Sequence, residues 1–162
     1  MDQGEKSGSG PLDGIRVLDW TMWQFGPVST MMLADLGAEV IKIEPLDGDH
    51  ARQFHRVSGA QTMLPGGLNA YFQSLNRQKK SLAIDLKKPK GVEVMYDLVK
   101  ESDVFVQNFR KGVAERLSLG YEDLRKHKPD IVYGSATGYG PEGPDSHKPA
   151  FAYTGEARSG SL

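Results

Sequence analysis

The chain has 162 residues, of which 38% are hydrophobic and 25% charged, and it contains no cysteine. This balance predicts one globular domain with a core, and the absence of cysteine excludes disulfides, cysteine-based zinc sites and thiol nucleophiles. Lys and Arg number 20 against 21 Asp and Glu, so no overall field favours nucleic acid, and an anion site must be a local cluster.

The chain also lacks the marks of metal binding, export or membrane insertion. The four His residues follow no metal-ligand spacing, so we expect no metal. No apolar run approaches the roughly 20 residues of a membrane span. The polar, Gly/Ser-rich start resembles no signal peptide. We therefore expect residues 1–10 to form a flexible arm and the protein to be cytoplasmic, with no membrane or nucleic-acid partner.

The first 45 residues predict a compact βαβ unit. Residues 15–20 (IRVLDW) have the β-branched, apolar character of a buried strand, and the turn TMWQFGP follows. Pro27 can open a helix at no cost, and Gly37 is a natural stop for it. Residues 38–44 (AEVIKIE) then predict a second strand, reached by a right-handed parallel crossover.

The middle of the chain begins with a long irregular segment. Residues 45–67 contain no clear period, and loops of this length are usually functional or mobile. A short helix or turn is expected at 71–75. Residues 81–86 (SLAIDL) predict a third strand, and Pro89 begins a helix that reaches about Glu101.

Strands and helices continue to alternate until about residue 140. The predicted elements are a strand at 104–106, short helices at 113–117 and 121–127, and a strand at 131–135. This alternation predicts an α/β fold, with a mostly parallel Rossmann-like sheet and helices on both faces. Residues 141–162 are dense in Gly and Pro, with no helix or strand expected, and are typical of an interrupted domain.

Polar and charged residues gather at the edge of the predicted sheet where ligands bind in folds of this type. In a parallel α/β sheet this is the edge formed by the carboxyl ends of the strands. Gln24, Asn76 and Asn108 offer hydrogen bonds there, and Phe109 offers a ring for an adenine. Cations suited to phosphate are Arg77, Lys79, Lys80, Arg110, Lys111 and Arg116. The inventory favours an anionic, nucleotide-like ligand.

Each of these signals has a plain structural alternative. The cations of NRQKK (residues 76–80) could simply be solvated. Phe109 could be a core anchor, and Asn108 could cap the helix expected from Val113. The segment GYGPEGP could be an ordinary Gly/Pro turn. These alternatives stay open at this point.

A dinucleotide site is the obvious competitor. Glu44 ends the second strand, where an acidic residue could bind a ribose. The first turn, however, contains only Gly26 where the dinucleotide fingerprint needs three glycines, and it holds the bulky Trp23 and Phe25. NAD binding is therefore disfavoured.

Several ordered segments carry a resemblance to a known family. They are PLDGIRVLDW, QFGP, MMLADLGAEVIKIEPLDGD, SLNRQKKSLAIDLK, VFVQNFRKGVAERLSLGYEDL and PDIVYGSATGYGPEGP. Together they resemble the N-terminal part of the class III CoA-transferases, which include formyl-CoA transferase and carnitine CoA-transferase. The resemblance runs from Pro11 to the last residue.

The resemblance implies a function and a set of site residues. It implies reversible transfer of CoA between an acyl-CoA and a small carboxylic acid, with an Asp that forms a covalent intermediate. Gln24 would lie at the reacting end as an orienting residue. Arg77 and Lys79 would assist a CoA site whose adenine and phosphate part is lined by Leu75, Asn108, Phe109 and Arg116.

The sequence also departs from the family pattern. Relatives are much longer, with a second, smaller domain, and the nucleophilic Asp is expected just beyond Leu162. Phe151 stands where a racemase branch has an acid–base His, Ala152 where the family has Asp, and Thr137 where formyl-CoA transferase has Lys. Asp145 and Glu156 are interpreted as loop carboxylates.

We therefore expect residues 11–140 to form a CoA-binding domain that is incomplete relative to the family fold. Residues 141–162 would lead toward the missing catalytic segment. The chain would be an inactive fragment of an enzyme that works as a homodimer or heterodimer. Alternatives are a non-catalytic subunit that partners an active chain and, less favoured, an NAD-type nucleotide-binding domain.

Overall fold

A computed structural model describes residues 10–57 and 59–161. Apart from Gly10, the expected N-terminal arm lies outside the described residues. Within the described part, none of the helices is both long enough and apolar enough to cross a bilayer.

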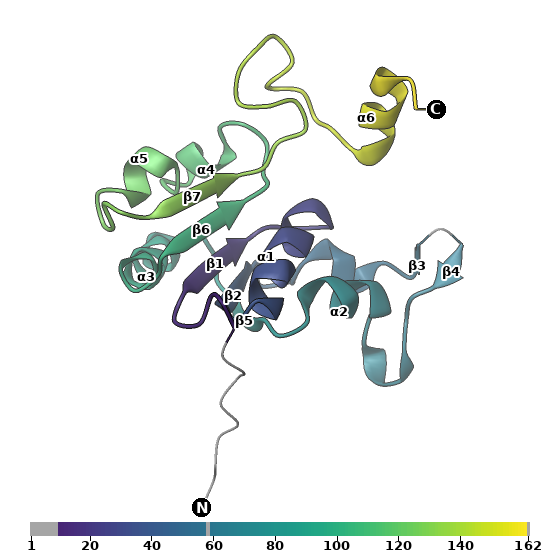
Figure 1. The fold of residues 1–162 in the computed structure, drawn as a ribbon, viewed down its shortest axis with the longest axis horizontal. Helices are drawn as coiled ribbons and strands as arrows, with labels where there is room; N and C mark the ends of the chain where they lie inside the picture. Colours follow the sequence, from purple (N-terminus) through teal and green to yellow (C-terminus); the bar gives the residue numbers. More distant parts are fainter. Residues whose placement is uncertain (1–9, 58, 162) are drawn as a thin grey trace, which may run out of the picture.

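The centre of the fold is a parallel sheet of five strands in the order β5-β2-β1-β6-β7. The strands are β1 (Arg16–Trp20), β2 (Glu39–Glu44), β5 (Lys80–Ala83), β6 (Val104–Gln107) and β7 (Val132–Ser135). The register sets Leu18 beside Ile41 of β2 and Phe105 of β6. Figure 1 shows the arrows of β1, β6 and β7 pointing the same way. The predicted parallel α/β sheet is confirmed.

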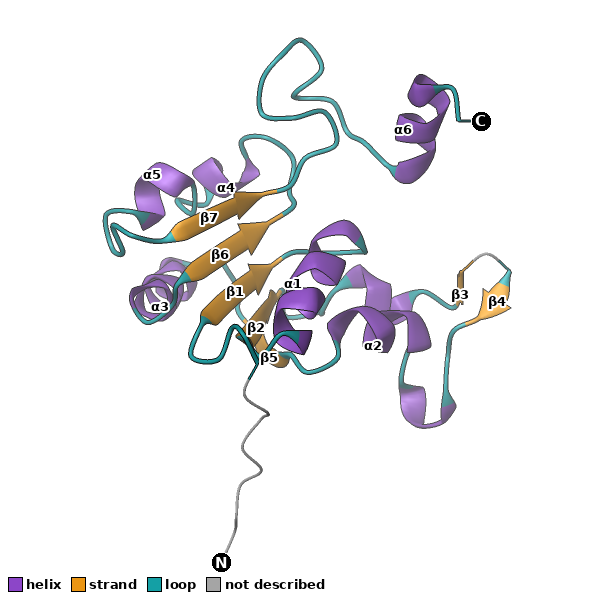
Figure 2. Ribbon diagram, viewed as in Figure 1, coloured by secondary structure: helices purple, strands orange, loops and turns teal. Residues whose placement is uncertain are grey.

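Helices cover both faces of this sheet. The helices around it are α1 (Phe25–Asp35), α2 (Ala70–Asn76), α3 (Pro89–Lys100), α4 (Val113–Arg116) and α5 (Tyr121–Leu124). Side chains alternate along β1, so Val17 packs with Ala34 of α1, while Leu18 belongs to a larger apolar cluster with Met95 of α3. In Figure 2, α1 and α3 accordingly lie on opposite sides of the strands.

The larger cluster lies mainly under β1, β6 and the helices α3 to α5. Its fully buried members include Leu18, Met95, Val99, Phe105, Leu119 and Leu124. Removing this much apolar surface from water is the dominant stabilising contribution to such a domain. The core therefore fixes the carboxyl ends of β1 and β6 relative to each other.

The long segment predicted as a loop contains short elements. They are the 3₁₀ turn η1 (His50–Gln53), the antiparallel strands β3 (Arg56–Val57) and β4 (Ala60–Gln61), and the 3₁₀ turn η2 (Pro65–Gly67). Asn69 ties the segment down, because its side chain caps α2 at the Phe72 N–H (3.0 Å) and donates to the Phe54 carbonyl (2.7 Å).

Several predicted boundaries shift. The third strand ends at Ala83 rather than residue 86, because the Asp85 carboxylate accepts from the Lys87 N–H (3.0 Å) in the turn before α3. The first helix begins at Phe25, two residues before Pro27. The helix expected at 121–127 is α-helical only from Tyr121 to Leu124.

The expectation that residues 141–162 hold no helix was wrong. They contain α6 (Ala152–Ser159), whose first turn is closed by a bond from the Phe151 N–H to the Thr154 hydroxyl (2.9 Å). Gly160 ends the helix with a φ of 77°. The absence of a buried period was correctly noted, since every residue of α6 is exposed. Figure 1 shows α6 set apart from the sheet.

Candidate functional site

The strand order places a ligand crevice between β1 and β6. From β1 the chain proceeds outward to β2 and β5, whereas from β6 it proceeds in the other direction to β7. The order therefore reverses between these two neighbours, and ligands of open α/β sheets bind beyond the carboxyl ends at such a point. Trp20 of β1 and Gln107 of β6 stand opposite each other there.

A cavity of about 310 Å³ lies at this position. Most of its lining is apolar or aromatic. The lining residues are Met22, Trp23, His50, Asn108, Phe109, Arg110, Pro149, Ala150 and Phe151. The structure thus brings Asn108 and Phe109 together at the crevice, while Gln24, Leu75, Arg77, Lys79 and Arg116 are not among the lining residues.

Asn108 holds the turn that follows β1. Its Oδ1 accepts from the Met22 N–H (2.9 Å) and its Nδ2 donates to the Met22 carbonyl (2.7 Å). The helix from Val113 begins instead after Gly112, with no side-chain cap. The alternative interpretation of Asn108 as the cap of that helix was therefore wrong.

Phe109 is both a core anchor and a cavity wall. Its ring centroid lies 4.3 Å from that of Trp20, and it packs against the larger core cluster. Its N–H donates to the Gln107 side chain (2.8 Å), which in turn donates to the Ser135 hydroxyl (2.8 Å). This fixed backbone keeps the ring at the mouth of the crevice.

Gln24 precedes α1 and is exposed. Its side-chain oxygen accepts from the Tyr71 hydroxyl at 3.4 Å. Gly26 beside it is required by packing, since a Cβ there would lie 2.4 Å from the Cβ of Thr21. The one glycine of the turn thus allows α1 to approach β1 closely.

Lys79 is buried in a network rather than directed at solvent. Its ammonium pairs with the Asp19 carboxylate (2.8 Å) and donates to the carbonyl of Pro27 (2.8 Å) and to the side chains of Thr30 (2.9 Å) and Asn76 (2.9 Å). Burial lowers the pKa of Lys79, and the Asp19 carboxylate opposes that shift. All three N–H groups are engaged, so this geometry does not favour a direct contact with phosphate.

The other cations predicted for the site differ in their partners. Arg77 pairs with Asp35 of α1 and donates to the Ser74 carbonyl (3.0 Å), so it joins α2 to α1. Leu75 is a buried residue of α2 itself. Arg116 is exposed at the end of α4, and its guanidinium forms no hydrogen bond within residues 10–57 and 59–161. It is therefore available to an anion.

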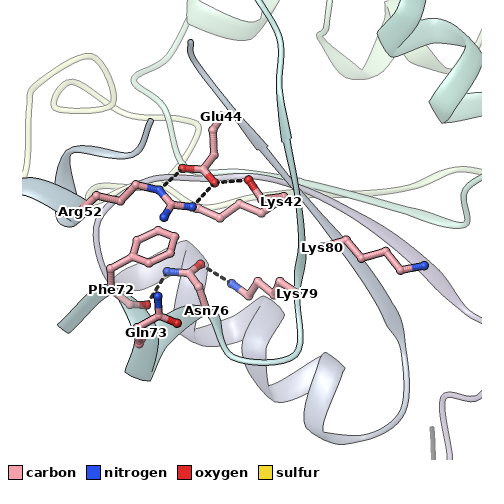
Figure 3. A pocket seen from close by; sticks show the side chains of 9 residues that line it. Lys42, Glu44, Arg52, Phe72, Gln73, Asn76, Lys79 and Lys80 are labelled. Carbon is pink, nitrogen blue, oxygen red and sulfur yellow. Dashed lines mark hydrogen bonds and ion pairs between the residues drawn. The ribbon is translucent and has the colours of Figure 1, made fainter. Parts of the chain in front are cut away.

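A second, polar cavity of about 190 Å³ lies between the second half of β2 and the beginning of β5. Figure 3 shows Glu44 and Arg52 paired there, with Lys80 pointing away. The Glu44 carboxylate accepts from Arg52 (2.7 Å), the Ser81 hydroxyl (2.7 Å) and the Asp49 N–H (2.9 Å). Burial opposes its ionisation, but these bonds prevail and lower the pKa of Glu44 to about 2.

The engaged Glu44 explains why this edge does not resemble a dinucleotide site. Both of its oxygens are used within the protein, so it is not free to bind a ribose. Arg52 is held further by the Phe72 ring, whose centroid lies 3.7 Å from the guanidinium carbon. Sequence reasoning missed this cluster, although the charged Lys42 and Glu44 inside the apolar run VIKIE were a signal of it.

A metal site is not evident in the described part of the chain. There, no group of three or more His, Cys, Asp or Glu residues is arranged to hold an ion.

Comparison with known proteins identifies the family. The model of CoA-transferase family III matches residues 12–162. The chain belongs to this family. The resemblance drawn from the six ordered segments is confirmed.

Similar proteins agree with the family assignment. Succinyl-CoA:glutarate CoA-transferase of Mus musculus is 44% identical over 156 residues, which cover 94% of this chain and 34% of that protein. Formyl-CoA:oxalate CoA-transferase of Afipia carboxidovorans is 41% identical over 131 residues, covering 80% of this chain and 30% of that protein. The chain thus spans about a third of the length of these curated relatives.

Solved structures show the same fold. The crystal structure of Rv3272 from Mycobacterium tuberculosis matches with a TM-score of 0.85 and 41% identity, over 94% of this chain and 41% of that one. A CAIB/BAIF family protein from Brucella suis matches with a TM-score of 0.84 and 33% identity, over 94% and 40%. Because the match covers only 41% and 40% of the two solved chains, this chain is incomplete relative to the family fold, as expected.

Proposed function

We propose that this chain is the CoA-binding part of a CoA-transferase and that CoA or an acyl-CoA lies along the carboxyl edge of the sheet. The observation that carries the proposal is the crevice between β1 and β6. It combines the aromatic wall of Phe109 with Asn108, and the exposed Arg116 lies one short helix further along the chain. Family membership favours CoA over other nucleotide-like ligands.

Three parts of the ligand have different requirements. An adenine needs a flat apolar surface, which Phe109 provides. Phosphates need cations without internal partners, which Arg116 satisfies within the described residues and Lys79 does not. The acyl end would lie toward Gln24, with Leu75 and Arg77 supporting the edge from α2.

The chemistry would be transfer of CoA to a small carboxylic acid. A carboxylate nucleophile, which we place C-terminal to Leu162, would attack the thioester carbonyl and form an anhydride while the CoA thiolate leaves. The thiolate would then attack the enzyme's side of that anhydride, giving an enzyme–CoA thioester and releasing the first acid. The second acid would then take up the CoA by the same two steps in reverse, which regenerates the enzyme carboxylate. We also propose that the enzyme works as a dimer, in which this chain pairs with an identical or a related chain.

Calorimetric titration of CoA tests the proposal. We expect Arg116→Ala to raise the dissociation constant about tenfold, the equivalent of one charge-assisted hydrogen bond. Asn108→Ala should weaken binding as well, because the turn after β1 loses both of its bonds to that side chain. Arg125→Ala, a change of an exposed Arg at the C-terminal end of α5, is the matched control and should bind like the unmodified chain.

Two results would contradict the proposal. One is CoA binding that does not respond to either Arg116→Ala or Asn108→Ala. The other is tight binding of NADH by the same chain, which the occupied Glu44 and the single Gly26 argue against.

A further inference from the structure

The turn after β1 contains an unusual backbone conformation. Trp23 has a φ of +70°, in the left-handed region. A bulky side chain is disfavoured there, because its Cβ approaches the backbone too closely. Such a conformation persists only where the surrounding structure imposes it, and it tends to occur at binding sites.

Three side chains from separate segments hold this turn. Asn108 from the end of β6 binds both backbone groups of Met22. Lys42 of β2 donates to the Thr21 carbonyl at 2.9 Å. Asp49 accepts from the Trp23 N–H itself, at 3.4 Å.

Two of these side chains form a buried ion pair. The Lys42 ammonium lies 3.0 Å from Oδ2 of Asp49, and the two side chains are 1% and 0% exposed. Oδ2 has no hydrogen bond in the described part of the protein, so it depends on Lys42 alone. Oδ1 accepts hydrogen bonds from the backbone, from the Ala51 N–H (2.9 Å) as well as from the Trp23 N–H. Such a buried pair is by itself weak evidence of stabilisation, because the cost of desolvating both charges offsets much of their attraction.

The held turn directs Trp23 to the crevice. Its ring lies edge-on to Phe54, with centroids 5.3 Å apart, and 5.6 Å from the ring of His50. The side chain is 38% exposed and lines the same cavity as Asn108 and Phe109. A change of the backbone at Trp23 would therefore move one wall of that cavity.

We infer that the buried Lys42–Asp49 pair is a positioning device that fixes Trp23 as a wall of the ligand crevice. Lys42 and Asp49 are positioning residues, since both are buried and act through the turn. The role of the wall in holding CoA rests on the proposed function, whereas its fixation by the pair does not.

Hydrogen exchange of the unmodified chain gives the first test. The Met22 and Trp23 N–H groups each have a side-chain acceptor, so both should exchange slowly compared with the amides of exposed loop residues such as Glu142. Exchange of Trp23 as fast as that of Glu142 would overturn the inference. This measurement needs no variant and no ligand.

Two double variants then separate charge from hydrogen bonding. Lys42→Met with Asp49→Asn removes both charges but keeps an acceptor at Oδ1, whereas Lys42→Met with Asp49→Ala removes the acceptor too. Trp20→Phe in every chain leaves Trp23 as the single tryptophan, since the sequence has 2. Acrylamide quenching of Trp23 should increase with the Ala variant and stay near the parent value with the Asn variant.

Titration of CoA connects the wall to the ligand. The Ala variant should bind about fivefold more weakly than the Asn variant, the equivalent of one neutral hydrogen bond. Val99→Ala, a core change in α3, is the matched control for lost stability, and it should alter neither quenching nor affinity.

The outcomes distinguish the two proposals. Equal quenching of Trp23 in the folded Ala and Asn variants would overturn the positioning role. Altered quenching in a chain that does not bind CoA at all would contradict the proposed function and leave the positioning role in place.

Discussion

The two halves of the sheet, β1 with β2 and β5 on one side and β6 with β7 on the other, place their charged side chains differently. At the ends of β1 and β2, Asp19, Lys42 and Glu44 are at most 3% exposed, and each has a partner of opposite charge inside the protein. Beyond β6, Arg110 and Arg116 are exposed. The charged side chains of the first half form ion pairs within the protein and hold its backbone in place. The exposed cations of the second half remain available to a ligand.

The difference also follows the distribution of apolar residues. The larger core cluster lies mainly under β1, β6 and the helices α3 to α5, so burial of apolar side chains stabilises the half with β6 most. The half with β2 and β5 has the smaller apolar cluster against α1, and buried polar bonds, such as those from Lys79, also join it to α1 and α2. We therefore expect the two halves to respond differently to loss of charge, low pH and salt.

The largest expected effect is that of Lys79→Met. Among residues 10–57 and 59–161, this change leaves the fully buried Asp19 carboxylate with only the hydroxyls of Thr21 and Thr30 as partners. Breaking a buried pair on one side costs about 3–5 kcal/mol, measured here as the free energy of unfolding in urea. The double change Lys79→Met with Asp19→Asn should recover much of it, and an equal loss in both variants would contradict a charge origin.

Low pH should weaken the same half through Glu44. Its pKa falls from an ordinary 4.5 to about 2 in the folded protein, so the unfolded chain takes up the proton first. The resulting stability is fully present above pH 4.5 and is lost as the pH falls toward 2, by about 2–3 kcal/mol. Urea unfolding between pH 6 and about pH 2.5 measures it. A Glu44→Gln chain that shows the same pH slope would refute the assignment to Glu44.

Salt should act on the second half instead. Exposed cations such as Arg116 are screened by ions, whereas the buried pair of Lys79 and Asp19 is screened much less. Raising sodium chloride from about 0.05 to about 0.5 M should therefore weaken CoA binding by roughly tenfold. The unfolding cost of Lys79→Met should stay constant over that range. A salt-independent dissociation constant for CoA would place the phosphates elsewhere.

The smallest expected effect is that of Arg77→Met. Arg77 pairs with Asp35 in an exposed position, with side chains 49% and 32% accessible. Solvated pairs of this type contribute about 0–1 kcal/mol to stability. Urea unfolding should thus differ little from the unmodified chain, in contrast to Lys79→Met two residues away. A loss as large as that of Lys79 would show that exposure does not separate the two cations.

Much of the fold could be predicted from the sequence because its strands are short apolar runs separated by turn residues. The segments IRVLDW and AEVIKIE, with Gly37 between helix and strand, gave a βαβ unit that the structure confirms. The helix α6 was missed because it buries nothing and depends on the local bond at Thr154. Apolar periodicity, the main signal of a helix in sequence, is absent there.

The site was less predictable, because it depends on which charged residues find partners. Sequence reasoning grouped Lys79 with Arg116 as phosphate ligands, and only the fold shows that Lys79 is buried against Asp19, sixty residues earlier. The pair of Lys42 and Asp49 was missed for the same reason. Asn108 and Phe109 line the cavity at the crevice, because the end of a strand fixes its own position at the sheet edge, and their role in holding CoA stays a prediction.

The amide of Asn108 has a consequence for cooperativity. Its Oδ1 accepts from the Met22 N–H and its Nδ2 donates to the Met22 carbonyl. Just beyond the last residue of β6, the side chain thus forms the two hydrogen bonds that a backbone peptide unit would form. The turn after β1 cannot open unless the end of β6 releases it. Local unfolding at these two places, 86 residues apart in sequence, should therefore be one event with one free energy.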